Sequence, residues 1–266
     1  MKSKSGGNAV NIAYSLSLLT SRKIIVLGAV GRDGDQIIDF LKSTGVDISG
    51  ILKDNKLYTS TGRVITDMKD NQIWGFYYGA AVAAKNVDLK SHISGHSLVV
   101  LSPNHRDAFI KVLDDAIELK VDYIFDPGMT LTWIKDNDLI RGVVGCRFLV
   151  GNDYEISAVL KRTRLRKDEL LNKKISIITT LGEQGVMYED KAFQIKIPGY
   201  KVRKIVDPTG AGDAWRAGFI GALVEGEDVR QALKYGNILA SFAVEHYGTV
   251  NHRPQKSEII DRIRRL

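Results

Sequence analysis

Short runs of consecutive apolar residues recur along this chain and alternate with segments in which apolar residues return every three or four positions. A strand that is buried on both faces has the first pattern, and a helix with one buried face has the second. This alternation predicts an α/β fold with a mostly parallel sheet and helices on both of its faces. We expect strands at 24–27, 98–101, 123–125, 148–150 and 175–179, and helices at 8–19, 35–44, 107–119, 153–160, 167–171, 214–223, 229–246 and 256–266.

Residues 59–78 follow a different pattern. Two strand-like segments, 59–68 and 72–78, flank a turn-forming Lys-Asp-Asn sequence, and the first of them alternates single polar and apolar positions. Such alternation predicts a β-hairpin with one face in water. Four aromatic residues gather in the second half of the hairpin, and we expect at least two of them to pack inside it: Trp74, Phe76, Tyr77 and Tyr78.

A glycine-containing sequence just before the helix at 214–223 carries the clearest chemical signal. Gly210 and Gly212 let the backbone approach a ligand closely. The N–H groups at a helix start, together with the helix dipole, favour an anion there. Asp213 lies in the first turn, where a carboxylate beside an anion is useful if it moves a proton. The combination indicates phosphoryl transfer, with the amides of Gly210, Ala211 and Gly212 holding the phosphate.

Asp213 would then accept the proton of the attacking hydroxyl as a general base. The alternative interpretation is a loop whose carboxylate only caps the following helix, because Asp is common at helix starts.

The longer sequence 207–219 reads Asp-Pro-Thr-Gly-Ala-Gly-Asp-Ala-Trp-Arg-Ala-Gly-Phe. It resembles the C-terminal signature of the ribokinase-like family, also called the phosphofructokinase-B (PfkB) carbohydrate kinases. Three further motifs resemble elements of that family and occur in the family order. They are the glycine pair at 6–7 followed by Asn11, the Asn-x-x-Glu sequence at 152–155, and the turn at 179–186. The resemblance covers nearly the whole chain.

This resemblance implies a fold, an activity and a set of site residues. The fold is one ribokinase-like domain over 1–266, with 59–78 as a small β-lid over the substrate. The activity is ATP-dependent phosphorylation of an alcohol. Acceptor contacts fall on Gly6, Gly7, Asn11 and Phe76, with Asp213 as the base. ATP contacts fall on Asn152, Thr180, Gly182, Gly185, Gly210, Gly212 and Asn237. Glu155 is implied to act on Mg²⁺, and a monovalent cation is implied near Asp207.

Some sequences resemble the nucleoside-kinase branch of the family, in particular the prokaryotic adenosine kinase type. They include 76–80, 102–104 and 126–128. In that branch an aromatic near Phe76 stacks on the base, and polar side chains just after 126–127 contact it. Met129 and Thr130 stand where that type carries glutamines. We therefore expect a kinase for the 5′-hydroxyl of a nucleoside such as adenosine, with a broader nucleoside kinase or a ribose- or fructose-type sugar kinase as alternatives.

Members of the resembled family begin with a strand that carries an acidic, acceptor-binding residue. This chain starts almost at the glycine pair. We expect either a truncated reading of the gene or a protein without that strand. A catalytically silent, ligand-binding relative is therefore a further alternative, because a missing strand would leave backbone groups and apolar surface exposed.

Composition and charge bear on whether the protein binds nucleic acid or a membrane. The net charge of +7 comes from 38 Lys and Arg against 31 Asp and Glu, partly in the run 161–167. No aromatic residues interleave that run, so we interpret it as a solvated helix face and expect no nucleic-acid partner. No apolar run approaches the roughly 20 residues that span a bilayer, and the single cysteine, Cys146, excludes an internal disulfide. We expect a cytoplasmic enzyme with no membrane partner.

The hairpin at 59–78 also bears on assembly. A short hairpin leaves open strand edges and aromatic surface, and the pairing of two such hairpins would cover both. We expect a homodimer through this segment.

Overall fold

The computed structural model describes residues 6–66 and 72–266. Its centre is a six-stranded sheet with the order β10-β9-β8-β7-β6-β5. Four neighbouring strands are parallel, and the last two run antiparallel to their neighbours, so the prediction of a mostly parallel sheet is confirmed. The strands are β5 (Leu98–Leu101), β6 (Asp122–Phe125), β7 (Phe148–Asn152), β8 (Ser176–Thr180), β9 (Val186–Glu189) and β10 (Gln194–Ile197).

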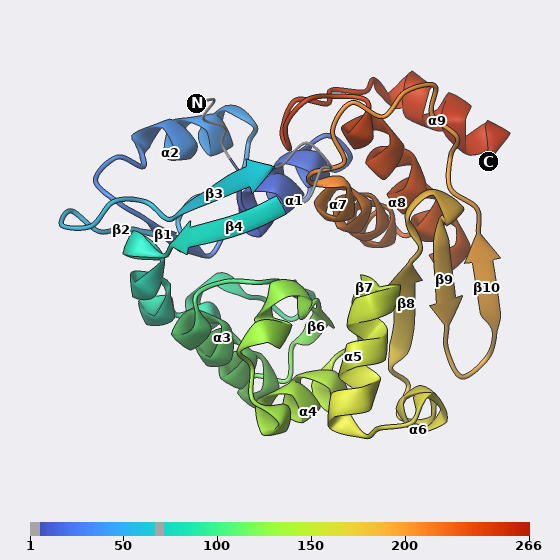
Figure 1. Ribbon diagram of the computed structural model, residues 1–266, viewed down its shortest axis with the longest axis horizontal. Helices are drawn as coiled ribbons and strands as arrows, with labels where there is room; N and C mark the ends of the chain where they lie inside the picture. The colour runs from blue at the N-terminus through green and yellow to red at the C-terminus, as the bar shows by residue number, and fades with distance from the viewer. Residues whose placement is uncertain (1–5, 67–71) are drawn as a thin grey trace.

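Helices cover both faces of this sheet (Figure 1). Successive side chains of a strand point to opposite faces, so in β7 Phe148 and Val150 join one buried cluster while Leu149 joins the other. The first cluster packs against α1 (Asn8–Ser17), α7 (Ala211–Val224) and α8 (Val229–Val244). The second packs against α3 (Arg106–Glu118), α4 (Asp136–Gly145), α5 (Asp153–Thr163) and α6 (Lys167–Asn172).

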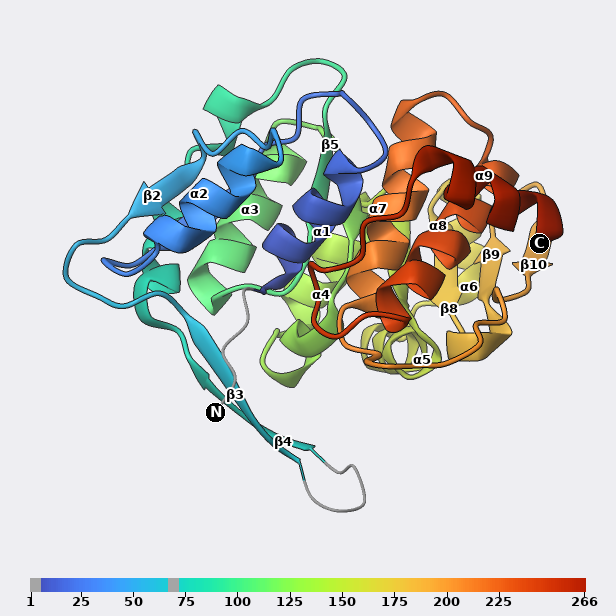
Figure 2. The same cartoon turned by 90° about the horizontal axis from the view of Figure 1, so that it is seen from above.

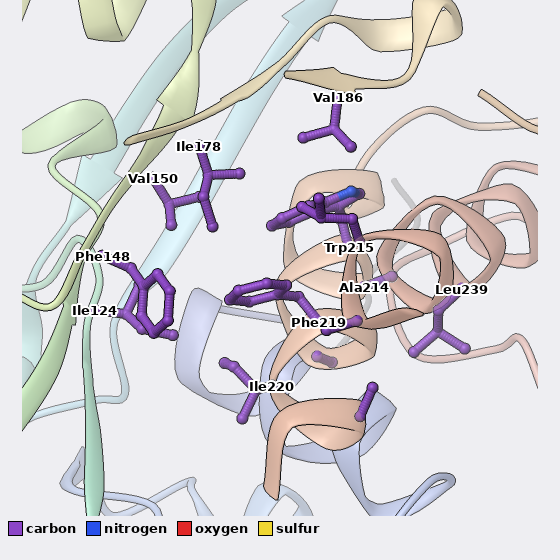
Figure 3. Packing of buried hydrophobic residues seen from close by; sticks show 14 of the residues in the cluster. Ile124, Phe148, Val150, Ile178, Val186, Ala214, Trp215, Phe219, Ile220 and Leu239 are labelled. Atoms are coloured by element: carbon purple, nitrogen blue, oxygen red, sulfur yellow. The ribbon is translucent and has the colours of Figure 1, made fainter. Parts of the chain in front are cut away.

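The α7 helix is buried nearly all round and lies between the sheet and α8. Trp215 and Phe219 stack with ring centroids 5.4 Å apart, and the ring of Phe148 from β7 meets Phe219 edge-on at 5.3 Å (Figure 3). A Cβ placed on Gly218 would lie 2.4 Å from the carbonyl oxygen of Tyr235, so glycine is what lets α8 approach this closely. Because α7 is packed between the sheet and α8, the direction of its N-terminal turn is fixed.

A second, smaller region carries two short sheets. The strands β1 (Gly28–Val30) and β2 (Ile51–Lys53) form a parallel pair beside α2 (Asp35–Ser43). The strands β3 (Thr61–Thr66) and β4 (Gln72–Tyr77) form the predicted antiparallel hairpin, whose turn lies outside the described residues. Figure 2 shows this hairpin projecting away from the body of the molecule. We call β3 and β4 the lid.

Several predicted elements differ from the structure. The strand expected at 24–27 is wrong, because only Ile25 makes an isolated bridge there, to Asp47, and strand pairing begins at Gly28. The apolar run marks burial instead, since Val26 packs in a cluster with α2. Further described elements were not expected from the hydrophobic pattern: β1, β2, α4, β9, β10 and the 3-10 turns η1 (Gly79–Asn86), η2 (Leu89–His92), η3 (Gly128–Thr132) and η4 (Gly182–Gln184).

The C-terminal helix α9 (Lys256–Arg265) was expected and packs on the outside of α8. Among the described residues, β5 pairs only with β6, and β1–β2 does not join the larger sheet. The absence of a first family strand stays a prediction. No helix of the described chain is both long and apolar enough to cross a membrane.

Candidate active site

The site begins at the N-terminal turn of α7. Gly210 precedes the helix with φ 81°, a left-handed conformation that favours glycine. The helix starts at Ala211, so the first amides of this turn have no acceptor within the helix and lie at the positive end of the helix dipole. The Ala211 amide donates to the Pro208 carbonyl over 3.2 Å. Asp213 lies in the first turn and is only 8% exposed. Local sequence alone therefore builds the turn, and tertiary packing buries its carboxylate.

Two asparagines of α1 hold that carboxylate. The Asn11 amide donates to Asp213 Oδ2 over 2.7 Å, and the Asn8 amide donates to Oδ1 over 3.0 Å. Burial raises the pKa of Asp213, and the charge of Arg216 and the two amide hydrogen bonds oppose that rise. A helix-capping carboxylate would instead accept from the backbone of its own helix. The geometry thus fits a group that is held to accept a proton from outside.

The acceptor residues gather at the same place. Gly7 precedes α1 with φ 105°, and a Cβ placed on Gly6 would lie 3.9 Å from Asn11 Oδ1. That oxygen is buried and has no hydrogen-bond donor among the described residues. An unpaired buried acceptor is costly unless a ligand supplies a donor. The fold therefore brings together the glycine pair, Asn11 and Asp213. A ligand hydroxyl bound there could donate the hydrogen bond that Asn11 Oδ1 lacks.

A buried ion pair that the motif analysis did not expect stands behind the turn. Arg216 Nη2 lies 2.7 Å from Asp126 Oδ1, and both side chains are buried, with Asp126 only 2% exposed. Burial raises the pKa of Asp126 to about 6, while Arg216 acts in the opposite direction. No local spacing signals this pair, because Asp126 precedes Arg216 by 90 residues. The sequence shows only that Arg216 lies on the same helix face as Asp213, three residues earlier.

The predicted nucleotide residues lie at the carboxyl ends of β7 and β8, where ligands bind in such sheets. Asn152 caps α5, because its side-chain oxygen accepts a hydrogen bond from the backbone amide of Glu155 over 2.8 Å, and Glu155 Oε2 accepts one from the backbone amide of Asn152 over 2.8 Å. Thr180 is the register partner of Asn152 on β8. Gly182 and Gly185 follow in the turn after β8, with φ 58° and 93°. The family resemblance predicted these residues as ATP contacts, and the sheet brings Asn152 and Thr180 side by side. Their contact with ATP stays a prediction.

Asn237 occupies a different kind of position. Its side chain is buried in α8, accepts from the Trp215 indole over 2.9 Å and donates to the carbonyls of Ile197 and Pro198. These bonds tie α8 to α7 and to the end of β10. A direct contact of Asn237 with ATP stays a prediction.

The donors present suit a magnesium ion bound mainly by phosphates. Among the described residues no three His, Cys, Asp or Glu side chains cluster as a metal cage. Mg²⁺ in phosphoryl-transfer sites needs only one or two carboxylates besides water and phosphate oxygens. Glu155 supplies such a carboxylate at the end of β7. Asp207 accepts the amides of Thr209 at 2.9 Å and Gly248 at 3.0 Å, so it braces the loop; the monovalent cation near it stays a prediction.

The lid supplies the aromatic surface. Phe76 is 49% exposed, and Tyr77 and Tyr78 are similarly exposed, so the expectation that at least two of the four aromatics pack inside the hairpin is wrong. A two-stranded hairpin with no layer behind it has no interior. Phe76 and Tyr77 instead line a cavity of about 660 Å³ at the root of the lid, together with Asp33 and Tyr58.

A sequence profile described as the pfkB family of carbohydrate kinases matches residues 1–256. The chain belongs to that family. The ribokinase-like fold and kinase activity predicted from the motifs are thereby confirmed. The buried Asp213 at the start of α7 and the cluster at the ends of β7 and β8 are accordingly the candidate active site of a pfkB-family kinase.

Known relatives of this pfkB-family kinase include nucleoside kinases. It is 33% identical to the nucleoside kinase of Methanothermobacter thermautotrophicus, over 98% of this chain and 85% of the relative. The structure of Burkholderia thailandensis nucleoside kinase in complex with inosine has a TM-score of 0.93 at 26% identity, covering 100% of this chain and 87% of that one. The same protein in complex with ADP-inosine gives a TM-score of 0.89 at 25% identity, covering 100% and 84%.

Proposed function

We propose that this kinase transfers the γ-phosphoryl group of ATP to the 5′-hydroxyl of a nucleoside such as adenosine. The observation that carries the proposal is the Asp213 carboxylate, buried at the start of α7 and held by Asn11 beside an unpaired acceptor atom. Support for the acceptor comes from the relatives, one of which binds inosine, and from the aromatic surface of the lid. Support for the donor comes from the family and from the ADP-inosine complex of a similar structure.

In this proposal each residue has a separate task. Asp213 accepts the proton of the nucleoside 5′-hydroxyl. At the same time the hydroxyl oxygen attacks the γ-phosphorus, and the bond between that phosphorus and the leaving ADP oxygen breaks. The amides of Gly210, Ala211 and Gly212 bind the moving phosphoryl oxygens. Glu155 would hold Mg²⁺ through water, and the bound ion would neutralise phosphate charge. Gly6, Gly7 and Asn11 hold the ribose hydroxyls.

The residues expected to contact the nucleobase, Met129 and Thr130, predict weak selectivity among nucleosides. Met129 is exposed in η3, and the hydroxyl of Thr130 is buried with no partner among the described residues. A site rejects an analogue strongly only when it makes hydrogen bonds that the analogue leaves unpaired. With few polar groups near the base, the enzyme should phosphorylate adenosine, guanosine and inosine with similar kcat/KM.

A panel of acceptors tests this function. The full chain is incubated with ATP and Mg²⁺ and with adenosine, guanosine, inosine, ribose or fructose, and phosphorylated products are separated by ion-exchange chromatography. We expect the nucleosides to react best and to give 5′-monophosphates. Better turnover of ribose or fructose would establish the sugar-kinase alternative. Nucleotide binding without turnover of any acceptor would establish the silent, ligand-binding relative.

We also propose a homodimer through the lid. Ile65 and Ile73 are cross-strand partners and are 73% and 74% exposed. Apolar surface of this kind, beside strand edges with no further partner among the described residues, is commonly covered by a second copy. Light scattering at micromolar concentration should report a dimer, and Ile73→Lys should convert it to a monomer. A wild-type monomer at that concentration would contradict the proposal.

A further inference from the structure

The guanidinium of Arg216 lies directly behind the phosphate-binding turn. A Cβ placed on Gly212 would come 2.9 Å from Arg216 Nη1, so the guanidinium packs against the backbone of Gly212. The opposite nitrogen, Nη2, is held by Asp126 Oδ1 at 2.7 Å. Arg216 is only 8% exposed. The cation is therefore fixed between a buried carboxylate on one side and the anion-binding backbone on the other.

Two features distinguish Arg216 from an ordinary structural ion pair. Its Nε is buried and has no acceptor among the described residues, so the guanidinium is not saturated by the protein. Burial opposes its charge, yet the carboxylates of Asp126, Asp213 and Glu155 outweigh that effect and raise its pKa. The same single cation thus acts on three carboxylates: Asp126 just after β6, the proposed base Asp213 in α7 and the proposed magnesium residue Glu155 in α5.

Phosphoryl transfer gives such a cation a task. The γ-phosphate brings several negative charges to a place already surrounded by carboxylates, and catalysis in this reaction is mostly positioning and charge stabilisation. A fixed charge in a buried site acts far more strongly than one in water. Helix amides alone contribute a partial charge of only about one half at a helix start. The positive end of a buried ion pair beneath the turn would add to them.

We propose that Arg216, held by Asp126, is a positioning residue that places the positive end of a buried ion pair against Gly212 and thereby makes this turn selective for the γ-phosphate of ATP. The inference rests on the proposed kinase function and names the charge on which that function depends. Arg216 does not touch the phosphate; it acts through the Gly212 backbone and through its field. Asp126 fixes the guanidinium in place.

The test compares binding of ADP with binding of a non-hydrolysable ATP analogue, the β,γ-imido form, by calorimetry with Mg²⁺. Arg216→Gln would leave Asp126 as an unpaired buried charge, which is itself strongly destabilising. The main variant is therefore Arg216→Gln with Asp126→Asn, in which two neutral amides can hydrogen-bond in place of the ion pair. Arg216→Lys is the second variant. The lysine ammonium can still form an ion pair with Asp126, but it has no second nitrogen to pack against the Gly212 backbone.

We expect the double variant to unfold as one cooperative transition, to bind the ATP analogue about tenfold more weakly, and to bind ADP as the wild type does. Its kcat with adenosine should fall about 10²-fold, the scale for removing one electrostatic contact at a transition state. Arg216→Lys should lose part of the preference for the ATP analogue over ADP. A matched control replaces Arg262 and Glu245, an ion pair of 2.6 Å between α9 and the end of α8, by Gln and should change neither quantity.

A double variant with wild-type kcat and an unchanged ratio of ATP-analogue to ADP affinity would overturn the proposal and leave the pair a structural one. If the double variant does not fold, an unchanged ratio in Arg216→Lys would overturn it equally. The outcome is separable from the fate of the proposed function. A wild type that phosphorylates no nucleoside would reject the acceptor, while the binding ratio would still decide the role of Arg216.

Discussion

The start of α7 and the lid both carry proposed site residues, but the protein builds these two regions in opposite ways. Asp213 and Arg216 are buried, and each is fixed by side chains from another part of the chain. The lid has only its two paired strands, and its side chains at Ile65 and Ile73 are mostly exposed. A reacting group must be held within a fraction of an ångström, whereas a lid must let the acceptor enter before it excludes water. In the proposed function, the chemistry therefore lies on packed elements and the recognition of the acceptor lies on a weakly packed one.

The sharpest way to break this comparison is to remove the base. Asp213→Asn keeps the shape of the side chain but cannot accept the proton, so kcat should fall by roughly 10²–10⁴ while ATP binding and the fold persist. Steady-state kinetics and calorimetry measure both. The control is Asp228→Asn, because Asp228 accepts the Gln231 amide as the cap of α8 and Asn caps equally well. Turnover at the wild-type rate in Asp213→Asn would reduce Asp213 to a similar capping role.

The second prediction concerns stability. Phe219 is fully buried and contacts Trp215 and Phe148, so Phe219→Ala should lower the free energy of unfolding by about 3–5 kcal/mol. Ile73 on the lid is 74% exposed in the single chain. At a concentration low enough to keep the chain monomeric, Ile73→Ala should change the free energy of unfolding by less than about 0.5 kcal/mol. Urea unfolding of both variants measures the contrast. Equal losses would show that the lid is packed in solution and that the two regions do not differ in this way.

The third prediction concerns recognition by the lid. Stacking of a base on an aromatic ring is worth about 1–3 kcal/mol. Phe76→Ala should therefore raise the KM for nucleosides about tenfold or more and leave the KM for ATP unchanged. Phe193→Ala is the matched control, since Phe193 is comparably exposed but lies between β9 and β10. An unchanged KM for nucleosides in Phe76→Ala would show that the nucleobase does not stack on the lid.

The smallest expected effect is a shift in pH dependence. Burial raises the pKa of Asp213, and a general base works only when it is deprotonated. The acid limb of the kcat–pH curve should therefore lie above the usual carboxylate value of about 4. Asn11→Leu removes a hydrogen bond that lowers this pKa, so the limb should move further toward neutral pH. If the acid limb of the kcat–pH curve has an apparent pKa near the usual carboxylate value and Asn11→Leu does not shift it, another group controls the rate.

Resemblance of short motifs to the family predicted the candidate site residues that lie within one local segment. The capping pair Asn152 and Glu155 lies three residues apart, and a helix start needs no more than that to bring the two groups together. Gly210 and Asp213 likewise form one turn of one helix. The central parallel strands were predicted because strands buried on both faces must be continuously apolar.

The features that sequence reasoning missed depend on contacts between distant segments. The apolar run at 24–27 was taken for a strand, because burial and strand pairing leave the same local pattern. The lid aromatics were expected to be partly buried, because a sequence does not show whether a second layer covers a hairpin.

The sequence by itself thus determined the family, the kind of chemistry and the turn that carries it. Only the tertiary structure decided the electrostatics of that turn. Asp213 meets Asn11 from 202 residues away, and Arg216 meets Asp126 from 90 residues away. The burial of Asp213 and Arg216 and the pairing of their charges are properties of the packed sheet and helices. They are absent from any local stretch of sequence, because the free energy of a charge depends on everything that surrounds it.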